Sequence, residues 1–462
     1  MHQWFIRNIT FPSYEKIKNL KITKYLNDLE ITQWHSSDKL EELQWLKLEK
    51  LLKHCFENVP YYHNLFNVIS LKPDDIKTIE DLNKIPTLTK CTLQKNLHQL
   101  IAKDKNRPYY IHKSSGSTGV PLKVHVDKRA ESYRCASLYR ARRWWGWDIG
   151  DKIIELRGGY EPKLQRRKVM REHLVENKKI FPALTINKDF VQQYFFTIKR
   201  FHPKFLYGYV SALYTITQLF DENGLNPSEL KLHGICTTAE VLYEYQRKFI
   251  ESVFNCPVMN EYGSSETGII SYQCPEGSMH LTNENLIVEF ICNGRSALPT
   301  QLGNIIITDL NNYVMPLIRY KIDDVGSIRE KPCCCGRGLT PMNITIGREC
   351  DMVVLKNGKL VLPLIFNFMG DDTIEEYNGK IKQFKVIQKA EDRFLMQIIV
   401  EPGFESMVMD YFTRSFRKKL GDYGKLDFEF VDEIPKDSSG KVHYFASDIR
   451  RDMRKNTEEL NL

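Results

Sequence analysis

The sequence predicts an α/β and α+β fold: a large N-terminal domain of several subdomains, rich in parallel strands and helices, and a small mobile α+β domain. From Asp151 to Glu261, apolar strand-like runs alternate with helical segments, the pattern of parallel sheets covered by helices. From about Leu286 the apolar period shortens to that of strands, and beyond Gly347 strands and a helix form a further unit. We therefore expect two domains, residues 1–346 and 347–462.

Composition and charge limit the class of protein. The chain is 42% hydrophobic and 27% charged, which is typical of a globular protein. No run approaches the ~20 apolar residues of a membrane span. The N-terminal stretch is too short and too broken by Arg7 and Pro12 for a signal peptide, so we expect a cytoplasmic protein. The net charge of +8 is scattered, which argues against nucleic acid and fits anionic small molecules.

Helices are expected at several places before the alternating segment. Apolar residues recur at helical spacing from Asp38 to Asn58, and Val59-Pro60 then ends this amphipathic helix. A short helix is expected at Ile79 to Leu82 and another from Thr92. Further along, Arg129 to Trp147 predicts a helix rich in Arg and Trp.

The alternating segment and the C-terminal unit follow in order. Strands are expected at Asp151–Leu156, Phe205–Tyr209, Leu232–Thr237 and Val258–Glu261, with helices at Asp189–Arg200, Ser211–Asp221 and Tyr243–Phe254. Later strands are expected at Ile287–Ile291, Asn304–Thr308 and Gly326–Arg329. The C-terminal unit should contain strands at Asp351–Leu355, Lys380–Lys389, Phe394–Val400 and Leu426–Val431, and a helix at Phe404–Leu420.

A loop rich in hydroxyl groups and glycine joins two strand-like runs, Pro108–His112 and Val124–Val126. Its centre is Ser114-Ser115-Gly116-Ser117-Thr118-Gly119, a flexible backbone whose N–H groups can turn toward a phosphate. It is not a Walker loop, because no Gly-Lys-Ser/Thr closes it onto a helix, and Pro121 indicates a hairpin-like turn. An ordinary surface turn has the same composition. The choice between the two depends on the rest of the chain.

A second polar stretch follows the strand expected at Val258–Glu261. Asn260-Glu261-Tyr262-Gly263-Ser264-Ser265-Glu266-Thr267 offers an aromatic ring for a base, a glycine for close approach, a hydroxyl for phosphate and a carboxylate for Mg²⁺. Thr237-Thr238-Ala239-Glu240 ends another strand at the same edge, where parallel sheets usually bind ligands. Taken alone, Glu266 fits a surface acid as well.

The motifs described above, in the order in which they occur along the chain, resemble those of the adenylate-forming ligase superfamily. They are most similar to those of its phenylacetate-CoA ligase branch. The resemblance covers nearly the whole chain. It implies an enzyme that couples a small carboxylic acid to ATP with Mg²⁺, releases pyrophosphate, and passes the acyl group from acyl-AMP to a thiol or another nucleophile.

The resemblance also implies roles for single positions. The ATP-binding positions that it implies are Ser114, Ser115, Gly116, Ser117, Thr118, Gly119, Thr238, Ala239, Glu240, Glu261, Tyr262, Gly263, Asp324 and Arg348. Ser265 matches the phosphate-contacting hydroxyl, and Glu266 matches the Mg²⁺ ligand. Asp324 ends Arg319-Tyr320-Lys321-Ile322-Asp323-Asp324, which resembles an Arg-Tyr-Arg-Thr-Gly-Asp signature, and should hold the ribose hydroxyls with help from Arg348.

The segment from Pro435 to Lys441 resembles the family's terminal Pro-Lys-Thr-x-Ser-Gly-Lys motif. Lys441 is then the catalytic cation that stabilises charge as the carboxylate attacks the α-phosphate, together with Glu266 and Ser265. Because Lys441 lies in the small domain, that domain must close over the large one. Two residues depart from the family pattern, Asp323 where the signature has Gly and Cys350 where the hinge has its first aspartate.

The eleven cysteines include a cluster that points to a metal. Six are expected to be reduced residues of the core: Cys55, Cys91, Cys135, Cys236, Cys256 and Cys292. Cys274, His280, Cys333 and Cys335 would give three thiolates and an imidazole, a tetrahedral Zn²⁺ set, and several relatives in the branch resemble this pattern. The alternative is a group of buried thiols without metal.

The acyl acceptor and the acid are left open by the sequence. CoA is the default of the branch, but a subgroup associated with capsular polysaccharide would transfer an acyl or aminoacyl group to an amine or hydroxyl of a polysaccharide precursor. The segment Pro60-Tyr61-Tyr62 resembles that subgroup. Candidates for lining the acid pocket, with core packing as the alternative, are Tyr160, Tyr207, Tyr209 and Cys236. A monomer or homodimer is expected, and a non-catalytic nucleotide-binding scaffold is the remaining alternative.

Overall fold

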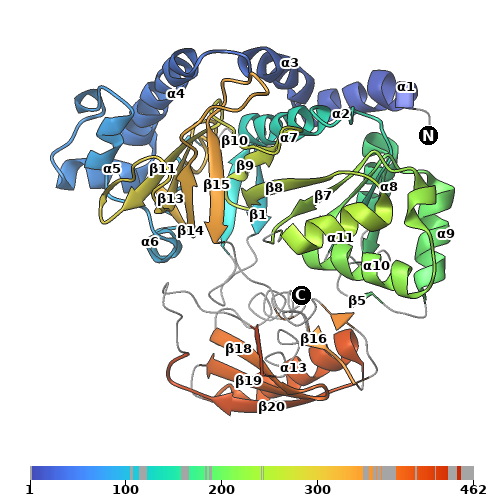
Figure 1. Ribbon diagram of the computed structural model, residues 1–462. Helices are drawn as coiled ribbons and strands as arrows, with labels where there is room; N and C mark the ends of the chain where they lie inside the picture. Colours follow the sequence, from blue (N-terminus) through green and yellow to red (C-terminus); the bar gives the residue numbers. More distant parts are fainter. Residues whose placement is uncertain are drawn as a thin grey trace.

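The computed structural model describes most of the chain. The described residues are 3–104, 108–113, 122–157, 166–182, 185–186, 190–240, 242, 244–346, 353–356, 360–361, 366, 381–400, 403–421, 423–434 and 445–448. Figure 1 shows a large sheet-rich domain and a separate C-terminal sheet domain below it. This confirms the predicted fold class, while the boundary at residue 346 stays a prediction.

The large domain is organised on one sheet, which in the described part of the chain has twelve strands in the order β12-β11-β13-β14-β15-β10-β9-β8-β7-β6-β3-β4. Its parallel half consists of β3 (Ile153–Arg157), β4 (Lys178–Pro182), β6 (Phe205–Tyr209), β7 (Gly234–Thr238) and β8 (Val258–Ser264). The helices of this half are α8 (Arg166–Glu176), α9 (Val191–Phe201), α10 (Val210–Glu222) and α11 (Glu244–Phe254), with the 3-10 turn η5 (Pro227–Leu230). The predicted alternation is therefore confirmed here.

The antiparallel half continues the same sheet. Its strands are β9 (Gly268–Gln273), β10 (Met279–Leu281), β11 (Leu286–Cys292), β12 (Arg295–Ser296), β13 (Gly303–Asp309), β14 (Tyr320–Ile328) and β15 (Pro341–Ile346). β8 joins the halves, because it pairs parallel with β7 and antiparallel with β9. Figure 1 shows the two halves side by side, with α10 and α11 near β7 and with α4 near β11 and β13.

The N-terminal segment is helical, and the sequence predicted helices at only three places in it, Asp38–Asn58, Ile79–Leu82 and from Thr92. It comprises α1 (Gln3–Phe5), the π-helix η1 (Ile6–Thr10), α2 (Phe11–Lys18), α3 (Ile22–Thr32), α4 (Ser37–Asn58), α5 (Pro60–Val68), the 3-10 turns η2 (Pro73–Asp75) and η3 (Glu80–Lys84), and α6 (Lys90–Lys95). The Ser36 side chain caps α4 by accepting from the backbone N–H of Lys39. Pro60 begins α5 at a position where a missing N–H costs nothing.

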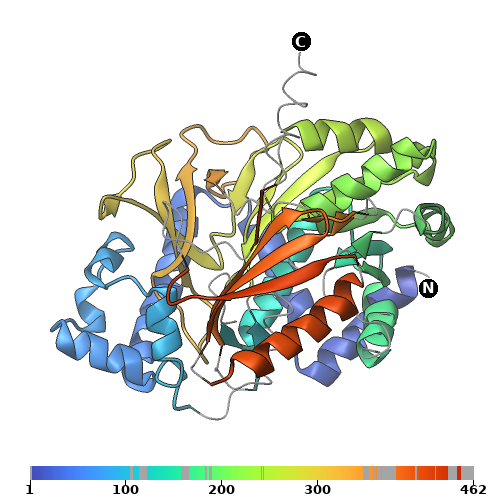
Figure 2. The ribbon, with the colours of Figure 1, turned by 90° about the horizontal axis from the view of Figure 1, so that it is seen from below.

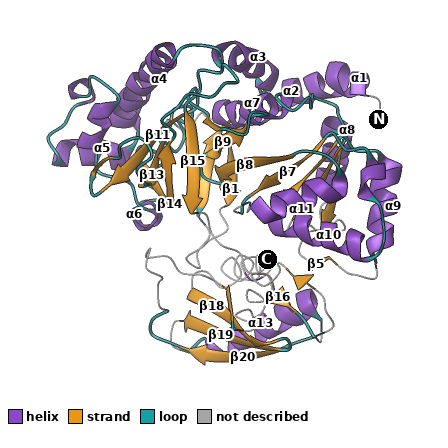
Figure 3. Cartoon of the chain, in the orientation of Figure 1, coloured by secondary structure: helices purple, strands orange, loops and turns teal. Residues whose placement is uncertain are grey.

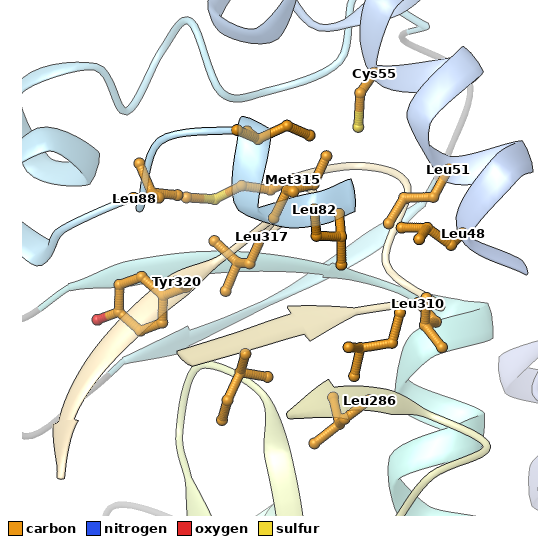
Figure 4. Close-up of a cluster of buried hydrophobic side chains, with 14 of the residues drawn as sticks. Leu48, Leu51, Cys55, Leu82, Leu88, Leu286, Leu310, Met315, Leu317 and Tyr320 are labelled. Atoms are coloured by element: carbon orange, nitrogen blue, oxygen red, sulfur yellow. The ribbon is translucent and has the colours of Figure 1, made fainter. Parts of the chain in front are cut away.

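The apolar face of α4 covers the antiparallel half. Figure 4 shows Leu48, Leu51 and Cys55 of this helix in one cluster with side chains of the sheet and its connections, Leu82, Leu88, Leu286, Leu310, Met315, Leu317 and Tyr320. Tyr62 of α5 is also buried; its hydroxyl donates to the Pro316 carbonyl at 3.1 Å and accepts from the Ile318 N–H at 2.9 Å. Burial of these side chains fixes the connection that leads into β14.

The strands β1 (Tyr109–Lys113) and β2 (Lys123–Asp127) form an antiparallel pair, followed by α7 (Lys128–Arg143). Lys113 pairs with Lys123, so the two ends of the intervening loop are held side by side, as the expected hairpin requires. Asp127 caps α7 by accepting from the Ala130 N–H at 2.8 Å.

The C-terminal domain has a four-stranded sheet in the order β20-β19-β18-β21 among its described residues. The elements are β18 (Ile381–Ala390), β19 (Arg393–Val400), α13 (Glu405–Leu420), β20 (Lys425–Phe430) and β21 (Phe445–Ser447). Figures 2 and 3 show α13 packed against one face of this sheet. A smaller sheet has the order β16-β17-β5, from β16 (Val353–Val354), β17 (Leu360–Val361) and β5 (Thr185–Ile186). Because β5 belongs to the first 346 residues, this sheet links the two parts of the chain.

Some predictions differ from the structure. The helix expected up to Trp147 ends at Arg143, and β14 extends from Tyr320 rather than from Gly326. Cys91, assigned to the core, is exposed on the short helix α6, so that prediction is wrong. The cysteines in the described residues form no disulfide. None of the described helices is both long and apolar enough to span a bilayer.

Candidate nucleotide and metal sites

The end of β8 and the turn into β9 form the centre of the candidate site. Tyr262, Gly263 and Ser264 lie on β8, and Ser265 and Glu266 lie in the turn. A β-bulge at Tyr262 and Gly263 bends the strand there. A Cβ on Gly263 would lie 2.6 Å from the Gly268 carbonyl oxygen, so only glycine allows β8 and β9 to approach so closely.

Tyr262 is tied to Asp324 of β14. Its hydroxyl donates to Asp324 Oδ2 at 2.9 Å, and both side chains are half-buried. Asp324, which the sequence predicts from a signature, lies inside β14. The structure therefore brings together two residues that are 62 positions apart in the chain and that the sequence assigned to the same nucleotide.

Glu266 is 9% exposed and is held by two other elements. Tyr320 Oη donates to Glu266 Oε1 at 3.3 Å. Arg134 of α7 donates to the main-chain carbonyl of Glu266 and, at 3.2 Å, to Asp309 Oδ2. In Figure 4 the Tyr320 hydroxyl points away from the labelled leucines. A carboxylate oriented in this way can ligate a hard cation such as Mg²⁺.

Arg319 has a structural role next to this site. Its guanidinium contacts Glu289 through Nε at 3.0 Å and Nη2 at 2.9 Å, and Nη1 donates to the Ile85 carbonyl at 2.6 Å. The residue has a φ of 52°, in the left-handed region. These contacts lock the segment before α6 against the start of β14, where Tyr320 lies.

Glu261 faces the opposite side of β8 from Tyr262. Its Oε1 accepts from Tyr207 Oη at 2.9 Å and from Thr238 Oγ1 at 3.0 Å. Burial raises the pKa of Glu261, although the positive charge of Arg142 opposes this. The sequence placed Glu261 with the ATP-binding positions, which stays a prediction. Its side chain contacts Tyr207 of β6 and Thr238 of β7.

The segment after β7 is sharply turned. Ala239 is exposed and has a φ of 67°, a backbone conformation that non-glycine residues rarely adopt. Glu240 follows it at the same edge of the sheet and is half-buried. Thr238 is the last residue of the parallel strand β7, and Ala239 and Glu240 follow it at the edge where the sequence expected them.

Some expected site residues cannot be placed. Lying outside the described residues are Ser114, Ser115, Gly116, Ser117, Thr118, Gly119, Arg348, Cys350 and Lys441, and also Tyr160 of the expected acid pocket. Two positions that the sequence did not single out contact the site, Arg134 and Arg142. Both lie on α7, in the helix predicted to be rich in Arg, but no motif distinguishes them from their neighbours.

Cys274, His280, Cys333 and Cys335 converge in one cluster. One ligand atom from each lies within 4.8 Å of all the others. Cys335 Sγ is 3.3 Å from His280 Nε2, and Cys274 Sγ is 3.7 Å from Cys333 Sγ. His280 Nδ1 is 3.0 Å from the Leu339 carbonyl; if it carries the proton it donates there, leaving Nε2 with a free lone pair. Burial lowers the pKa of His280, which favours the neutral, metal-binding imidazole.

The C-terminal segment, residues 363–448, matches the family model described as the CapK C-terminal domain. Protein CapK of Staphylococcus aureus is 25% identical over 430 residues, covering 91% of this chain and 92% of that protein. A phenylacetate-coenzyme A ligase of Thermus thermophilus is 26% identical over 342 residues, covering 69% and 72%. This chain is a relative of both. The predicted resemblance to the phenylacetate-CoA ligase branch is thereby confirmed.

The fold is that of acyl-CoA ligases. The crystal structure of 2-hydroxyisobutyryl-CoA ligase, in complex with 2-HIB-AMP and CoA in the thioesterification state, aligns with a TM-score of 0.63. The alignment covers 93% of this chain and 94% of that chain at 15% sequence identity. Both the large domain and the C-terminal domain therefore have counterparts in that fold.

Proposed function

We propose that the protein is an ATP-dependent, AMP-forming carboxylic acid ligase that activates an acid as acyl-AMP and transfers the acyl group, with CoA as acceptor. The contact between Tyr262 and Asp324, beside a Glu266 carboxylate oriented by Tyr320, is the observation that carries this proposal. Relatives that share about a quarter of the sequence are named phenylacetate-coenzyme A ligases, which supports it.

Each described residue of the site has a role in this chemistry. Tyr262 would lie along the adenine, and Asp324 would accept hydrogen bonds from the ribose hydroxyls. Glu266 would hold Mg²⁺, and the bound ion supplies charge neutralisation for the phosphates. Its orientation by Tyr320 and Arg134 keeps that carboxylate in place before ATP arrives. Lys441 is proposed as the cation that stabilises the reacting α-phosphate.

The nucleotide site can be tested by binding. Calorimetric titration with ATP and Mg²⁺ should show binding to the wild type. Asp324→Ala should weaken it by roughly 10- to 100-fold, because the hydrogen bonds to ribose are lost. Tyr262→Phe, which removes the contact with Asp324 and keeps the ring, should weaken it less. Asp427→Ala, on the C-terminal sheet, is the matched control and should bind like the wild type. Equal binding by wild type and Asp324→Ala would contradict the proposal.

A second acceptor is favoured by one observation. The similarity to CapK spans 91% of the chain, against 69% for the Thermus thermophilus ligase, and the C-terminal segment matches the CapK domain. The alternative acceptor is an amine or hydroxyl of a capsular or surface polysaccharide precursor. An experiment that separates the two acceptors forms acyl-AMP on the enzyme and then adds CoA or amino sugars. Consumption of acyl-AMP by CoA alone supports CoA as the acceptor, and consumption by amino sugars alone supports the polysaccharide precursor.

We also propose that Cys274, His280, Cys333 and Cys335 bind a structural Zn²⁺. Three thiolates and one imidazole are a common tetrahedral set, and the distances among them fit a single ion. The cluster joins residues at and before β10 to the loop before β15. Because these two strands are paired, a zinc ion would hold them together.

Metal analysis tests this proposal with a control in the same loop. The purified wild type should contain about one zinc per chain. Cys335→Ser should lose it, whereas Cys334→Ser should keep it, because the exposed Cys334 lies outside the cluster and contacts Glu276 instead. A folded wild-type protein without zinc would contradict the proposal.

A further inference from the structure

Glu261 is a buried carboxylate with too few donors. It is 7% exposed. Its Oε1 accepts the hydroxyls of Tyr207 and Thr238. Its Oε2 has no hydrogen-bond partner among the described residues. A buried carboxylate oxygen without a hydrogen-bond donor is destabilising. This oxygen therefore requires a donor that the described residues do not supply.

The positive charge of Arg142 does not satisfy that oxygen. Arg142 of α7 is 6% exposed and lies over the Tyr207 ring, with its guanidinium carbon 4.8 Å from the ring centroid. Its Nε also has no partner among the described residues. Arg142 therefore offsets the charge of Glu261 from a distance, which keeps the pair close to neutral without occupying the free oxygen.

The position of Glu261 is suited to a ligand. At the carboxyl edge of the parallel strands, Thr238 of β7 pairs with Tyr209 of β6. The end of β7 also pairs with β8, the strand that carries Glu261. Tyr207 and Thr238 are only half-buried, so this spot is not sealed inside the core. The next residue along β8, Tyr262, contacts Asp324 on the opposite face of the strand. A molecule bound against Tyr262 could thus extend past the carboxyl end of β7, at Thr238, toward Glu261.

We propose that Glu261 Oε2 accepts a hydrogen bond from a hydroxyl or ammonium group on the chain of the acid that the protein activates. The acid is then a hydroxy acid or an amino acid, rather than an unsubstituted aryl or fatty acid. This inference rests on the proposed function. It makes Glu261 a specificity-determining residue, because a buried acceptor left without its donor penalises an acid that lacks one.

The test compares matched ligands by calorimetry. Acyl sulfamoyl-adenosines, non-hydrolysable mimics of acyl-AMP, are prepared as sets with the same carbon chain carrying no substituent, a hydroxyl or an amine. Sulfamoyl-adenosine without an acyl group reports the nucleotide site alone. The proteins are the wild type, Glu261→Leu, Glu261→Gln and, as matched control, Glu229→Gln, an exposed carboxylate that contacts Lys199.

In the wild type and in Glu229→Gln, a donor-bearing member of a set should bind roughly 10- to 100-fold more tightly than the unsubstituted member. Glu261→Leu should abolish that ratio. Glu261→Gln should keep it for a hydroxyl and lose it for an ammonium, which distinguishes the two donors. Equal binding of unsubstituted and donor-bearing members by the wild type would overturn the inference and mean that water satisfies Oε2. A ratio that survives in Glu261→Leu would overturn it too. Failure of sulfamoyl-adenosine itself to bind would instead overturn the proposed function, and the inference with it.

Discussion

Single residues of the large domain are fixed by partners far away in the chain. Arg140 and Glu284 are both 1% exposed and lie 2.5 Å apart, between α7 and the segment before β11. Thr32 of α3 donates to the same Glu284 oxygen at 2.9 Å. This pair connects three parts of the chain behind the candidate site. The sequence marked α7 as rich in Arg but could not say which of its arginines is buried, because the partners are distant in sequence.

Removing one member of this pair should be costly. Arg140→Met should lower the free energy of unfolding by about 3 to 5 kcal/mol, because it removes the guanidinium that contacts the buried Glu284 carboxylate. The double variant Arg140→Met, Glu284→Met should recover most of that loss. Urea unfolding measures both, and a double variant no more stable than the single one would contradict the account.

Lys47 of α4 should make stability depend on pH. Its ammonium donates to the Glu284 carbonyl at 2.6 Å and lies 4.4 Å from the Tyr133 ring centroid. Burial lowers the pKa of Lys47 to about 8. The unfolded chain keeps a pKa of about 10.4 for lysine, so between these values the unfolded state binds more protons and wild-type stability rises with pH.

Urea unfolding of the wild type and Lys47→Met at pH 7 and pH 10 measures this effect. The wild type should gain on the order of 1 to 3 kcal/mol relative to the variant over that interval. Lys50→Met, on the exposed side of the same helix, is the control and should show no such change. A difference between wild type and Lys47→Met that is constant with pH would refute the shifted pKa.

At the scale of elements, the site depends on the change of strand direction at β8. The sequence predicted β6 as Phe205–Tyr209, which the structure confirms, because a parallel strand in an alternating segment has a clear local pattern. The strand predicted for β8 stopped at Glu261, and the strand predicted for β14 began only at Gly326. The residues that extend these strands, 262–264 and 320–325, are mostly polar and are ordered by antiparallel partners. The sequence assigned Tyr262 and Asp324 to the same nucleotide, which stays a prediction, and it could not predict the contact between them.

Gly263→Ala tests the close approach of β8 and β9. The added Cβ would meet the Gly268 carbonyl oxygen, so the strands must separate, which should cost about 1 to 3 kcal/mol. Thermal unfolding with and without ATP and Mg²⁺ should also show a smaller stabilisation by the nucleotide, because Glu266 follows in the same turn. Gly294→Ala is the control. Gly294 has a φ of 78° and open space around it, so this substitution should cost about 1 kcal/mol through backbone strain alone. Undiminished stabilisation of Gly263→Ala by the nucleotide would contradict this view of the turn.

For the whole molecule, the large sheet carries the candidate nucleotide residues, and the C-terminal sheet is a separate unit (Figure 1). The pairing of β17 with β5 shows that the two parts meet directly. The sequence indicated this division from the return of a strand and helix pattern after the β-rich segment. It could not predict that the parallel and β-rich segments form one continuous sheet, since strand pairing across β8 and β9 depends on contacts that no local pattern records. Catalysis by Lys441 stays a prediction that requires the two parts to act together.

The central claim is that this protein activates a carboxylic acid as its adenylate, and ATP–pyrophosphate exchange tests it most directly. Labelled pyrophosphate should enter ATP in the presence of one class among aryl, fatty, hydroxy and amino acids. Lys441→Ala and Glu266→Gln should each lower the exchange rate by roughly 100-fold or more, because each removes charge stabilisation at the phosphates. A folded protein that binds ATP and Mg²⁺ yet shows no exchange with any acid would contradict the account and favour a nucleotide-binding scaffold.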